Sequence, residues 1–232
     1  MIKFENTDVY GFVAAICGMR NPLNSWGKSD SVHYVGTMNP CDGCPLEHKD
    51  CYEEVYAGDR LCLHIGQNDL ALMRKLAHAG DDHGKFARFI TVTVDITAPT
   101  YWWLEFDTYK VGTVSNSCSK MHKIHEKEFS VDDFSHEHLD KYPIELLSET
   151  IRVLNVARRE FLETKDKKYW WYLIQLLPMS YNQRRTVQLN YQVLNRIYNA
   201  RKNHKLDEWH EFCAWVEKLP YFREIYLGGD GD

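Results

Sequence analysis

Residues 177–201 read LPMSYNQRRTVQLNYQVLNRIYNAR. Apolar side chains recur here at intervals of three and four residues, which predicts a single helix over residues 183–203. On such a helix, residues three or four positions apart share one face. One polar and one charged residue then lie on the same stripe as two apolar ones: Asn190, Leu194, Ile197 and Arg201.

Arg201 is the residue of this stripe that needs an explanation. A buried arginine is unfavourable unless it is paired with a carboxylate or bound to a ligand. One interpretation is an ion pair with Glu145 or Glu149. The other is that the guanidinium holds a planar anion or the edge of a base, for which its forked donors are suited. The helix alone leaves both interpretations open.

Further helices are predicted on either side of this segment. In residues 144–161 the apolar side chains recur every three or four positions, which predicts an amphipathic helix of about five turns. A shorter apolar helix is expected over residues 169–176 and ends at Leu177-Pro178. Another is expected over residues 207–218. The C-terminal half is therefore predicted to be rich in helix.

The N-terminal half carries one clear helix and one clear strand. Residues 68–79 have helical spacing, with Asn68 or Asp69 as the expected N-cap and Gly80 as the end. Residues 89–96 alternate apolar and polar side chains, which is typical of a half-buried strand. Together with the C-terminal helices, these elements predict an α+β fold.

Residues 20–60 are rich in Gly, Pro, Asn, Asp and Ser and have no sustained period. Such a composition predicts loop or a small irregular insert. We therefore expect a single domain over residues 1–227, with an irregular Cys-rich insert at about 36–62. The Gly- and Asp-rich residues 228–232 are expected to be a flexible tail.

Composition excludes several classes of partner. The chain has 232 residues, 44% of them hydrophobic, and a net charge of -5. This charge provides no strong basic field for a nucleic acid polymer or an anionic membrane. No run approaches the roughly 18 to 20 apolar residues of a membrane span, and the N-terminus lacks the basic leader of a secretory signal. We expect a cytoplasmic protein.

A polar loop follows the aromatic run at residues 101–106. Residues 107–122 bring hydroxyl groups, two lysines, a thiol and a histidine into sixteen positions. Small donors mixed with cations are typical of loops that bind a phosphate and a sugar. The alternative is an ordinary solvated loop.

From about residue 68 to residue 217, the order of these features resembles the flavin-dependent thymidylate synthase family. That family has a Leu-Pro, then an Asn, and an Arg eleven residues after the Asn. Here Leu177-Pro178 is followed by Asn190, and Arg201 comes eleven residues later. This segment is the most specific part of the resemblance.

The family signature, an Arg-His-Arg followed by seven residues and a Ser, aligns less closely. Aligning Ala98-Pro99 with the dipeptide that often precedes it places Thr108-Tyr109-Lys110 on the Arg-His-Arg. Cys118 then falls on the Ser and Lys120 on a later Arg, whereas a shift of one residue puts Ser119 on the Ser. The same alignment places His83 on a histidine that contacts flavin. Ile174 stands where an Arg usually precedes the Leu-Pro.

The resemblance implies a homotetramer with FAD that methylates dUMP to dTMP. Methylenetetrahydrofolate would give the carbon, and NADPH would reduce the flavin that supplies the hydride. The residues expected to face the flavin are His83, Tyr109, Lys110 and Asn190. Those expected to hold the nucleotide phosphate and sugar are Asn116, Cys118 or Ser119, and Lys120. Arg201 would meet the pyrimidine edge and stabilise the negative charge that develops there.

The missing arginines suggest an alternative within the same fold. Lys110 keeps one cation of the signature, but a lysine holds a phosphate as a point charge and not in a bidentate contact. A divergent relative that binds a nucleotide and has lost the reaction would fit this pattern.

Four residues of the Cys-rich insert have the types and spacing of a structural zinc site. They follow the pattern Cys, two residues, Cys, three residues, His, two residues, Cys, and are Cys41, Cys44, His48 and Cys51. A reduced cluster that binds no metal is the alternative, and Cys62 with His64 offers competing ligands. The insert also suggests a third function, an interaction protein whose zinc-braced loop binds a macromolecule.

Overall fold

The computed structural model describes residues 2–36, 52–56 and 59–228. The chain divides into two compact units. The first unit comprises Met1–Glu5, Val94–Lys110 and Val114–Val187, and the second comprises Asn6–Thr93, Val111–Thr113 and Gln188–Asp232. Within the described ranges, no helix is long and apolar enough to cross a membrane.

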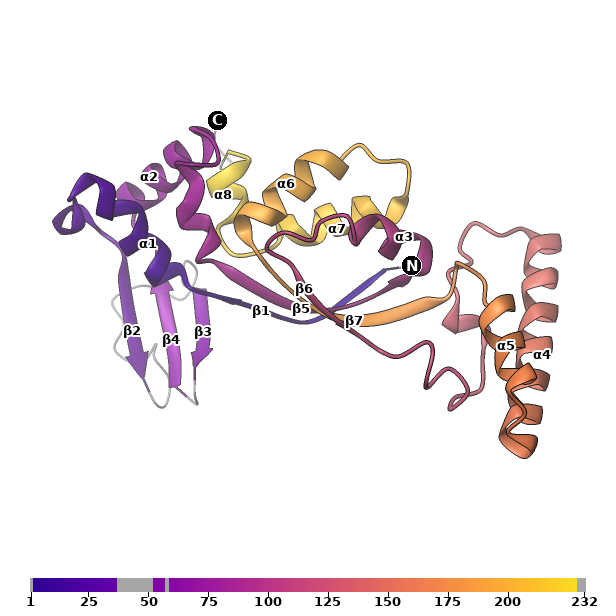
Figure 1. The fold of residues 1–232 in the computed structure, drawn as a ribbon. Coiled ribbons are helices and arrows are strands. Elements are labelled where there is room, and N and C mark those ends of the chain that lie inside the picture. The colour runs from indigo at the N-terminus through magenta and orange to yellow at the C-terminus, as the bar shows by residue number, and fades with distance from the viewer. Residues whose placement is uncertain (1, 37–51, 57–58, 229–232) are drawn as a thin grey trace. The chain divides into compact units, whose positions relative to one another are not determined.

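Four strands form a sheet in the order β1-β5-β7-β6 (Figure 1). Their bounds are Lys3–Tyr10 for β1, Thr91–Pro99 for β5, Val114–Ser117 for β6 and Asn182–Asn190 for β7. In β5 every second residue is buried, from Val92 to Ala98. The strand predicted over residues 89–96 is therefore confirmed from Thr91 onward, and it continues to Pro99.

The single helix predicted over residues 183–203 is wrong in its first half. Residues Asn182–Asn190 form strand β7, and helix α6 spans Tyr191–Arg201. In β7 the buried side chains alternate, with Gln183, Val187 and Leu189 on the inner side. A polar and a charged residue occupy inner positions of this strand, so its two-residue period is weak in the sequence.

Asn190 consequently does not share a helical face with Arg201. It is the N-cap of α6, and its side-chain oxygen accepts a hydrogen bond from the backbone N–H of Val193 at 3.1 Å. An asparagine in this position satisfies one of the unpaired donors in the first turn. The resemblance to the synthase family depends only on Arg201 coming eleven residues after Asn190 in the sequence. This spacing is the same whether Asn190 belongs to a helix or to a strand.

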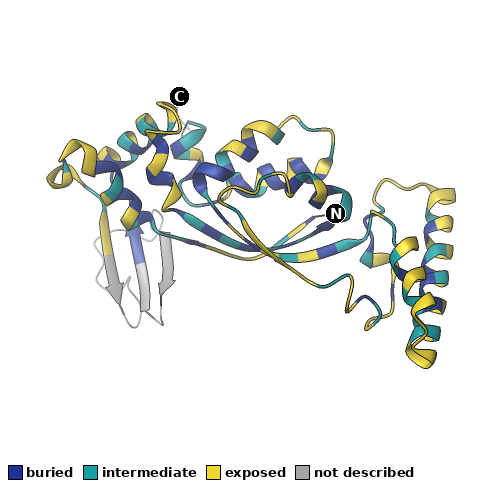
Figure 2. Cartoon of the chain, viewed as in Figure 1, coloured by how far each residue is buried: buried dark blue, intermediate teal, exposed yellow. Residues whose placement is uncertain are grey.

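The first unit also contains α3 (Thr100–Phe106), a 3₁₀ turn η4 (Val131–Asp133), α4 (Lys141–Thr164) and α5 (Lys167–Leu176). Helices α4 and α5 lie side by side and confirm the helices predicted at 144–161 and 169–176 (Figure 1). Buried and exposed residues alternate along α4 as they do in a helix covered on one side (Figure 2). Its buried residues share a core with Phe129, Phe134 and Leu173.

The second unit contains most of the other helices. They are α1 (Phe12–Arg20), α2 (Gln67–His78), α6, α7 (Asp207–Glu217) and α8 (Phe222–Tyr226), with the 3₁₀ turns η1 (Asn21–Leu23), η2 (Trp26–Lys28) and η3 (Gly84–Arg88). Edge-to-face rings join α1, α6 and α8, because Tyr191 lies 5.7 Å from Phe12 and 5.5 Å from Phe222 between ring centroids. The helix predicted over residues 207–218 is confirmed by α7.

The predicted helix at residues 68–79 is confirmed by α2, but its cap differs. Gly66 occupies the N-cap position, and the side chain of Asp30 accepts hydrogen bonds from the backbone N–H groups of Asn68 and Asp69, at 2.9 and 3.1 Å. Asp69 is buried instead and accepts from Arg20 Nε at 2.6 Å. The cap therefore comes from a distant residue that local spacing does not reveal.

The stretch predicted to be loop or irregular insert contains strands where the structure describes it. Strands β2 (Val32–Gly36), β4 (Asp59–His64) and β3 (Tyr52–Tyr56) form an antiparallel sheet in that order. Val32 pairs with His64, and Tyr56 with Asp59. Each strand has only five or six residues and stands among turn-forming residues, so the composition of the whole stretch hides the short strands.

Candidate functional site

The predicted site residues belong to both units. The first unit contains the polar-loop residues Tyr109, Lys110, Asn116, Cys118, Ser119 and Lys120. The second unit contains His83, Asn190 and Arg201.

Strand β7 fixes the backbone of Cys118. The N–H of Cys118 donates to the carbonyl of Arg184 at 3.1 Å, and its carbonyl accepts from Gln183 Nε2 at 2.8 Å. Gln183 is buried, whereas Cys118 is exposed and its thiol is not in a disulfide. The loop after β6 is therefore held in one register against β7, with the thiol accessible.

The two residues after Cys118 have different surroundings. Ser119 Oγ accepts a hydrogen bond from the backbone N–H of His122 at 2.9 Å. Lys120 is half-buried, and its Nζ donates to Thr100 Oγ1 at 3.3 Å. Burial lowers the pKa of Lys120, and the positive charge of Arg185 lowers it further. A half-buried ammonium near a second cation is an environment that favours an anion.

Arg185 is the residue of this region that sequence reasoning missed. Its guanidinium lies 4.1 Å from the centre of the Trp103 ring, and its Nη1 donates to Asp107 at 2.7 Å. Its Nε donates to the side-chain oxygen of Gln183 at 3.2 Å. The alternation of buried residues in β7 places Arg185 on the inner side. The sequence signal for this inner position is the two-residue period of a strand over residues 182–190.

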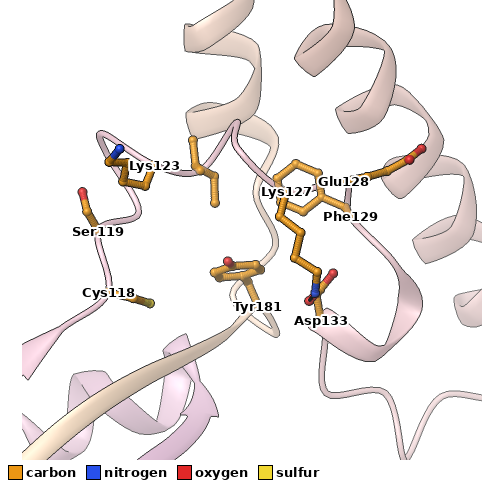
Figure 3. Close-up of a pocket in the computed structure, with 9 residues that line it drawn as sticks. Cys118, Ser119, Lys123, Lys127, Glu128, Phe129, Asp133 and Tyr181 are labelled. Atoms are coloured by element: carbon orange, nitrogen blue, oxygen red, sulfur yellow. Dashed lines mark hydrogen bonds and ion pairs between the residues drawn. The ribbon is translucent and has the colours of Figure 1, made fainter. Parts of the chain in front are cut away.

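A cavity of about 360 Å³ lies beside Cys118 and Ser119 in the first unit. Figure 3 shows the Tyr181 ring between Cys118 on one side and the Lys127 and Asp133 pair on the other. Lys127 Nζ donates to Asp133 at 2.8 Å. Burial raises the pKa of Tyr181 to about 12, and the charges of Cys118 and Asp133 act in the same direction. The phenol is therefore neutral and can donate a hydrogen bond at physiological pH.

The remaining loop residues lie nearer the solvent. Tyr109 is half-buried, and its N–H donates to the carbonyl of Phe106 at 3.0 Å. Lys110 and Asn116 are exposed. Their side chains are accessible to a ligand.

In the second unit, the turn at Gly112 lies against Asn190. Gly112 has a φ of +77°, and a Cβ there would lie 2.9 Å from Val193 Cγ2 and 3.3 Å from Asn190 Nδ2. Only glycine fits this backbone conformation and this space without strain. The adjacent Thr113 hydroxyl is buried and has no hydrogen-bond partner among the residues that the structure describes. Asn190 and Thr113 thus offer polar groups near the start of α6.

His83 and Arg201 lie elsewhere in the second unit. His83 is exposed at the start of η3, and its N–H donates to the carbonyl of Gly80 at 3.1 Å. Arg201 ends α6, with its guanidinium 4.7 Å from the centre of the Trp209 ring. Of the two carboxylates considered for Arg201, Glu149 accepts hydrogen bonds from Arg152 at both of its oxygens.

The four predicted zinc ligands, Cys41, Cys44, His48 and Cys51, lie outside the described residues. In the part of the chain that the structure describes, no three His, Cys, Asp or Glu side chains are grouped to hold a metal ion. Cys62, one of the competing ligands, is buried. The zinc site stays a prediction.

The amino-acid sequence matches no protein-family model and no curated protein. The fold is similar to that of two solved structures of the flavin-dependent thymidylate synthase ThyX from Helicobacter pylori, both with FAD and dUMP. One is 15% identical, with a TM-score of 0.61 over 96% of this chain and 95% of that chain. The other is 14% identical, with a TM-score of 0.61 over 96% and 94%. The chain has the fold of these synthases. The α+β prediction is thereby confirmed, and the expected resemblance is confirmed at the level of the fold.

Proposed function

We propose that this protein is a flavin-dependent thymidylate synthase that methylates dUMP to dTMP. The observation that carries the proposal is the half-buried Lys120, which follows a loop fixed on β7, in a chain with the synthase fold. A half-buried ammonium with hydroxyl groups around it suits a phosphate group. Methylenetetrahydrofolate as carbon donor, NADPH as reductant, a homotetramer and a cytoplasmic location belong to the same proposal.

The nucleotide phosphate and sugar are assigned to Asn116, Cys118 or Ser119, and Lys120. Ser119 Oγ accepts a hydrogen bond from His122 and keeps its own proton to donate to a ligand. The thiol of Cys118 is accessible beside the cavity. Either residue can therefore provide the contact. We assign Cys118 a binding role, because transfer of a hydride from a flavin requires no protein nucleophile.

The flavin is assigned to His83, Tyr109, Lys110 and Asn190, and when bound it supplies the hydride. The residues present fit such a group: the Thr113 hydroxyl is buried without a partner among the described residues, and the Asn190 amide lies against the same turn. Asn190 Oδ1 caps α6, which leaves its Nδ2 as the donor for a ring carbonyl. His83 adds an imidazole N–H, Tyr109 adds a phenol hydroxyl, and Lys110 adds a positive charge.

Arg201 is assigned to the pyrimidine edge. Its guanidinium lies over the Trp209 ring, which restricts its orientation. A fixed guanidinium stabilises the negative charge that develops on the pyrimidine when its C5 becomes nucleophilic. The Arg201→Ala variant is expected to weaken dUMP binding and to keep the fold. Unchanged dUMP binding would show that Arg201 is structural.

The test of the function is an absorbance spectrum between the near ultraviolet and the blue, followed by titration with FAD. The purified protein is expected to show flavin absorption, or to acquire it at one FAD per chain. A colourless protein that takes up no flavin would contradict the proposal. Formation of dTMP from dUMP, methylenetetrahydrofolate and NADPH completes the test.

The second candidate is a relative that binds a nucleotide without flavin chemistry. It is favoured by Thr108 and Ile174, which stand where the family has arginines. Thermal denaturation with dUMP, with FAD and with both ligands separates the two candidates, because a ligand raises the melting temperature only if it binds the folded state. Stabilisation by dUMP alone, with no effect of FAD, supports the second candidate.

A further inference from the structure

Arg185 is held by three groups on three different parts of the first unit. Trp103 on α3 supports the face of its guanidinium, Asp107 accepts from Nη1, and Gln183 on β7 accepts from Nε. The indole N–H of Trp103 in turn donates to the backbone carbonyl of Gln183 at 2.9 Å. The side chain of Arg185 is only 14% exposed. Its orientation is therefore fixed before any ligand binds.

One edge of this guanidinium remains available. Arg185 Nη2 makes no hydrogen bond to any residue that the structure describes. A guanidinium carries five N–H donors in a rigid fork, and such a fork matches two oxygens of a phosphate group. The unused donors point to an anionic ligand.

A second cation lies near Arg185. Gln183, which accepts from Arg185 Nε, also donates to the backbone carbonyl of Cys118, two residues before Lys120. Lys120 is half-buried with its Nζ on the Thr100 hydroxyl, and the charge of Arg185 lowers its pKa. Two like charges held close together are unfavourable unless an anion neutralises them. Asp107 provides one negative charge, and its side chain is 46% exposed. The positive charges of Arg185 and Lys120 together exceed the negative charge of Asp107 by one.

We propose that Arg185 and Lys120 together bind the phosphate monoester of the nucleotide, with the Thr100 hydroxyl as a further donor. Arg185 provides the bidentate cation that Thr108 and Ile174 cannot provide. This inference rests on the proposed function, because it names the phosphate group of that nucleotide as the ligand.

The neighbouring Arg184 is a matched control. It lies on the same strand but on the exposed side, where Nη2 donates to Asp95 at 2.7 Å and Nη1 lies 3.7 Å from Glu5. Arg184→Gln and Arg185→Gln thus remove the same charge from adjacent positions. Only the second removes it from the inner side, where the guanidinium contacts Trp103 and Asp107.

The experiment is calorimetric titration of the 232-residue protein and both variants with dUMP and with 2′-deoxyuridine, which lacks the phosphate. Arg185→Gln is expected to raise the Kd for dUMP by about 10- to 100-fold, because charge-assisted hydrogen bonds are among the stronger ones. The Kd for 2′-deoxyuridine is expected to stay the same. Arg184→Gln is expected to change neither.

An unchanged Kd for dUMP in Arg185→Gln, or an equal loss for dUMP and 2′-deoxyuridine, would overturn the inference. If Arg185→Gln does not fold, Arg185→Lys keeps the charge and removes the fork, and an intermediate loss for dUMP alone is expected. An Arg185→Lys protein with the wild-type Kd for dUMP would also count against the assignment.

Titration with inorganic phosphate and AMP, together with the FAD titration, separates this inference from the proposed function. Binding of phosphate and AMP that depends on Arg185, in a protein that takes up no FAD, supports the phosphate site and rejects the synthase. Uptake of FAD with dUMP binding that does not depend on Arg185 supports the synthase and rejects the phosphate site.

Discussion

Arg20 and Asp69 form a buried ion pair, with 5% and 0% of the side chains exposed. Asp69 also accepts hydrogen bonds from the hydroxyls of Ser29 and Ser31, at 2.6 Å each. Burial alone would raise the pKa of Asp69, but the hydrogen bonds from Ser29, Ser31 and Arg20 outweigh it and lower the pKa below its ordinary value. The carboxylate is therefore charged and fully partnered at neutral pH.

Removing one member of this pair leaves a buried charge without a partner. Arg20→Met is expected to lower the free energy of unfolding by about 3 to 5 kcal/mol, measured by urea denaturation at pH 7. The exposed pair of Arg152 and Glu149 is the control, and Arg152→Met is expected to leave the free energy of unfolding almost unchanged, because water screens the charges of this pair. Equal effects of the two substitutions would contradict this expectation.

The pH dependence follows from the lowered pKa of Asp69. In the unfolded chain Asp69 takes up a proton near pH 3.8, whereas in the folded protein it does so at lower pH. Its contribution to stability is thus present above pH 3.8 and is lost as the pH falls through the folded pKa. The free energy of unfolding is measured by urea denaturation at several pH values from neutral to acidic. In Asp69→Asn the loss of stability caused by protonation of this carboxylate is expected to be absent. The same loss of stability with falling pH in the wild-type and variant proteins would contradict this expectation.

Asn190 allows a structural role and a ligand role to be separated. Asn190→Ala is expected to destabilise the protein by about 1 kcal/mol, because it removes the cap of α6. Asn190→Asp keeps the capping oxygen and removes the Nδ2 donor. This variant is expected to retain the wild-type stability and to bind FAD more weakly, by fluorescence titration. Wild-type FAD affinity in Asn190→Asp would show that Asn190 only caps the helix.

At the scale of elements, the parts with a strong single period were predictable. Strand β5 and helices α4, α5 and α7 were expected, because their apolar residues repeat without interruption. Strand β7 was not, because the inner position of Arg185 breaks its alternation. Two of the three partners of Arg185, Asp107 and Trp103, lie 78 residues or more earlier in the chain, and no local pattern indicates such a contact. The polar composition of residues 107–122 indicates a ligand-binding loop, whereas the choice of Cys118 and Lys120 within it comes from alignment with a known family and stays a prediction.

The contact between α4 and α5 depends on a few fully buried side chains. Leu173 on α5 is 0% exposed and packs in the core of the first unit. Leu173→Ala is expected to lower the free energy of unfolding by about 2 to 5 kcal/mol. Leu176, three residues later on α5 and 47% exposed, is the control, and Leu176→Ala is expected to have less than half that effect by urea denaturation. A larger effect at Leu176 would show that its exposed face is covered in the native protein.

At the scale of the whole molecule, the chain has the synthase fold at 15% identity to a solved structure. A fold alone does not assign the residues of a site. The expected homotetramer and the zinc site are the features of the whole molecule that biochemistry now has to test. Neither is determined by the fold.

The zinc prediction has a direct measurement. Elemental analysis is expected to find one zinc per chain, and Cys41→Ser or Cys44→Ser is expected to lower this value while Cys62→Ser leaves it unchanged. A zinc content well below one per chain in the wild-type protein would remove the site. The result bears on stability and not on the reaction, because four protein ligands leave no open position on the metal.

The path of the chain between its two units sets a limit on how the protein can be divided. The backbone passes from one unit to the other five times, within β1, β5 and β7 and on either side of residues 111–113. No contiguous segment of the gene encodes a whole unit. A single crossover cannot transfer one unit to another protein, and cleavage at one loop cannot release it. Each unit can thus be inherited, expressed and varied only as part of the whole chain.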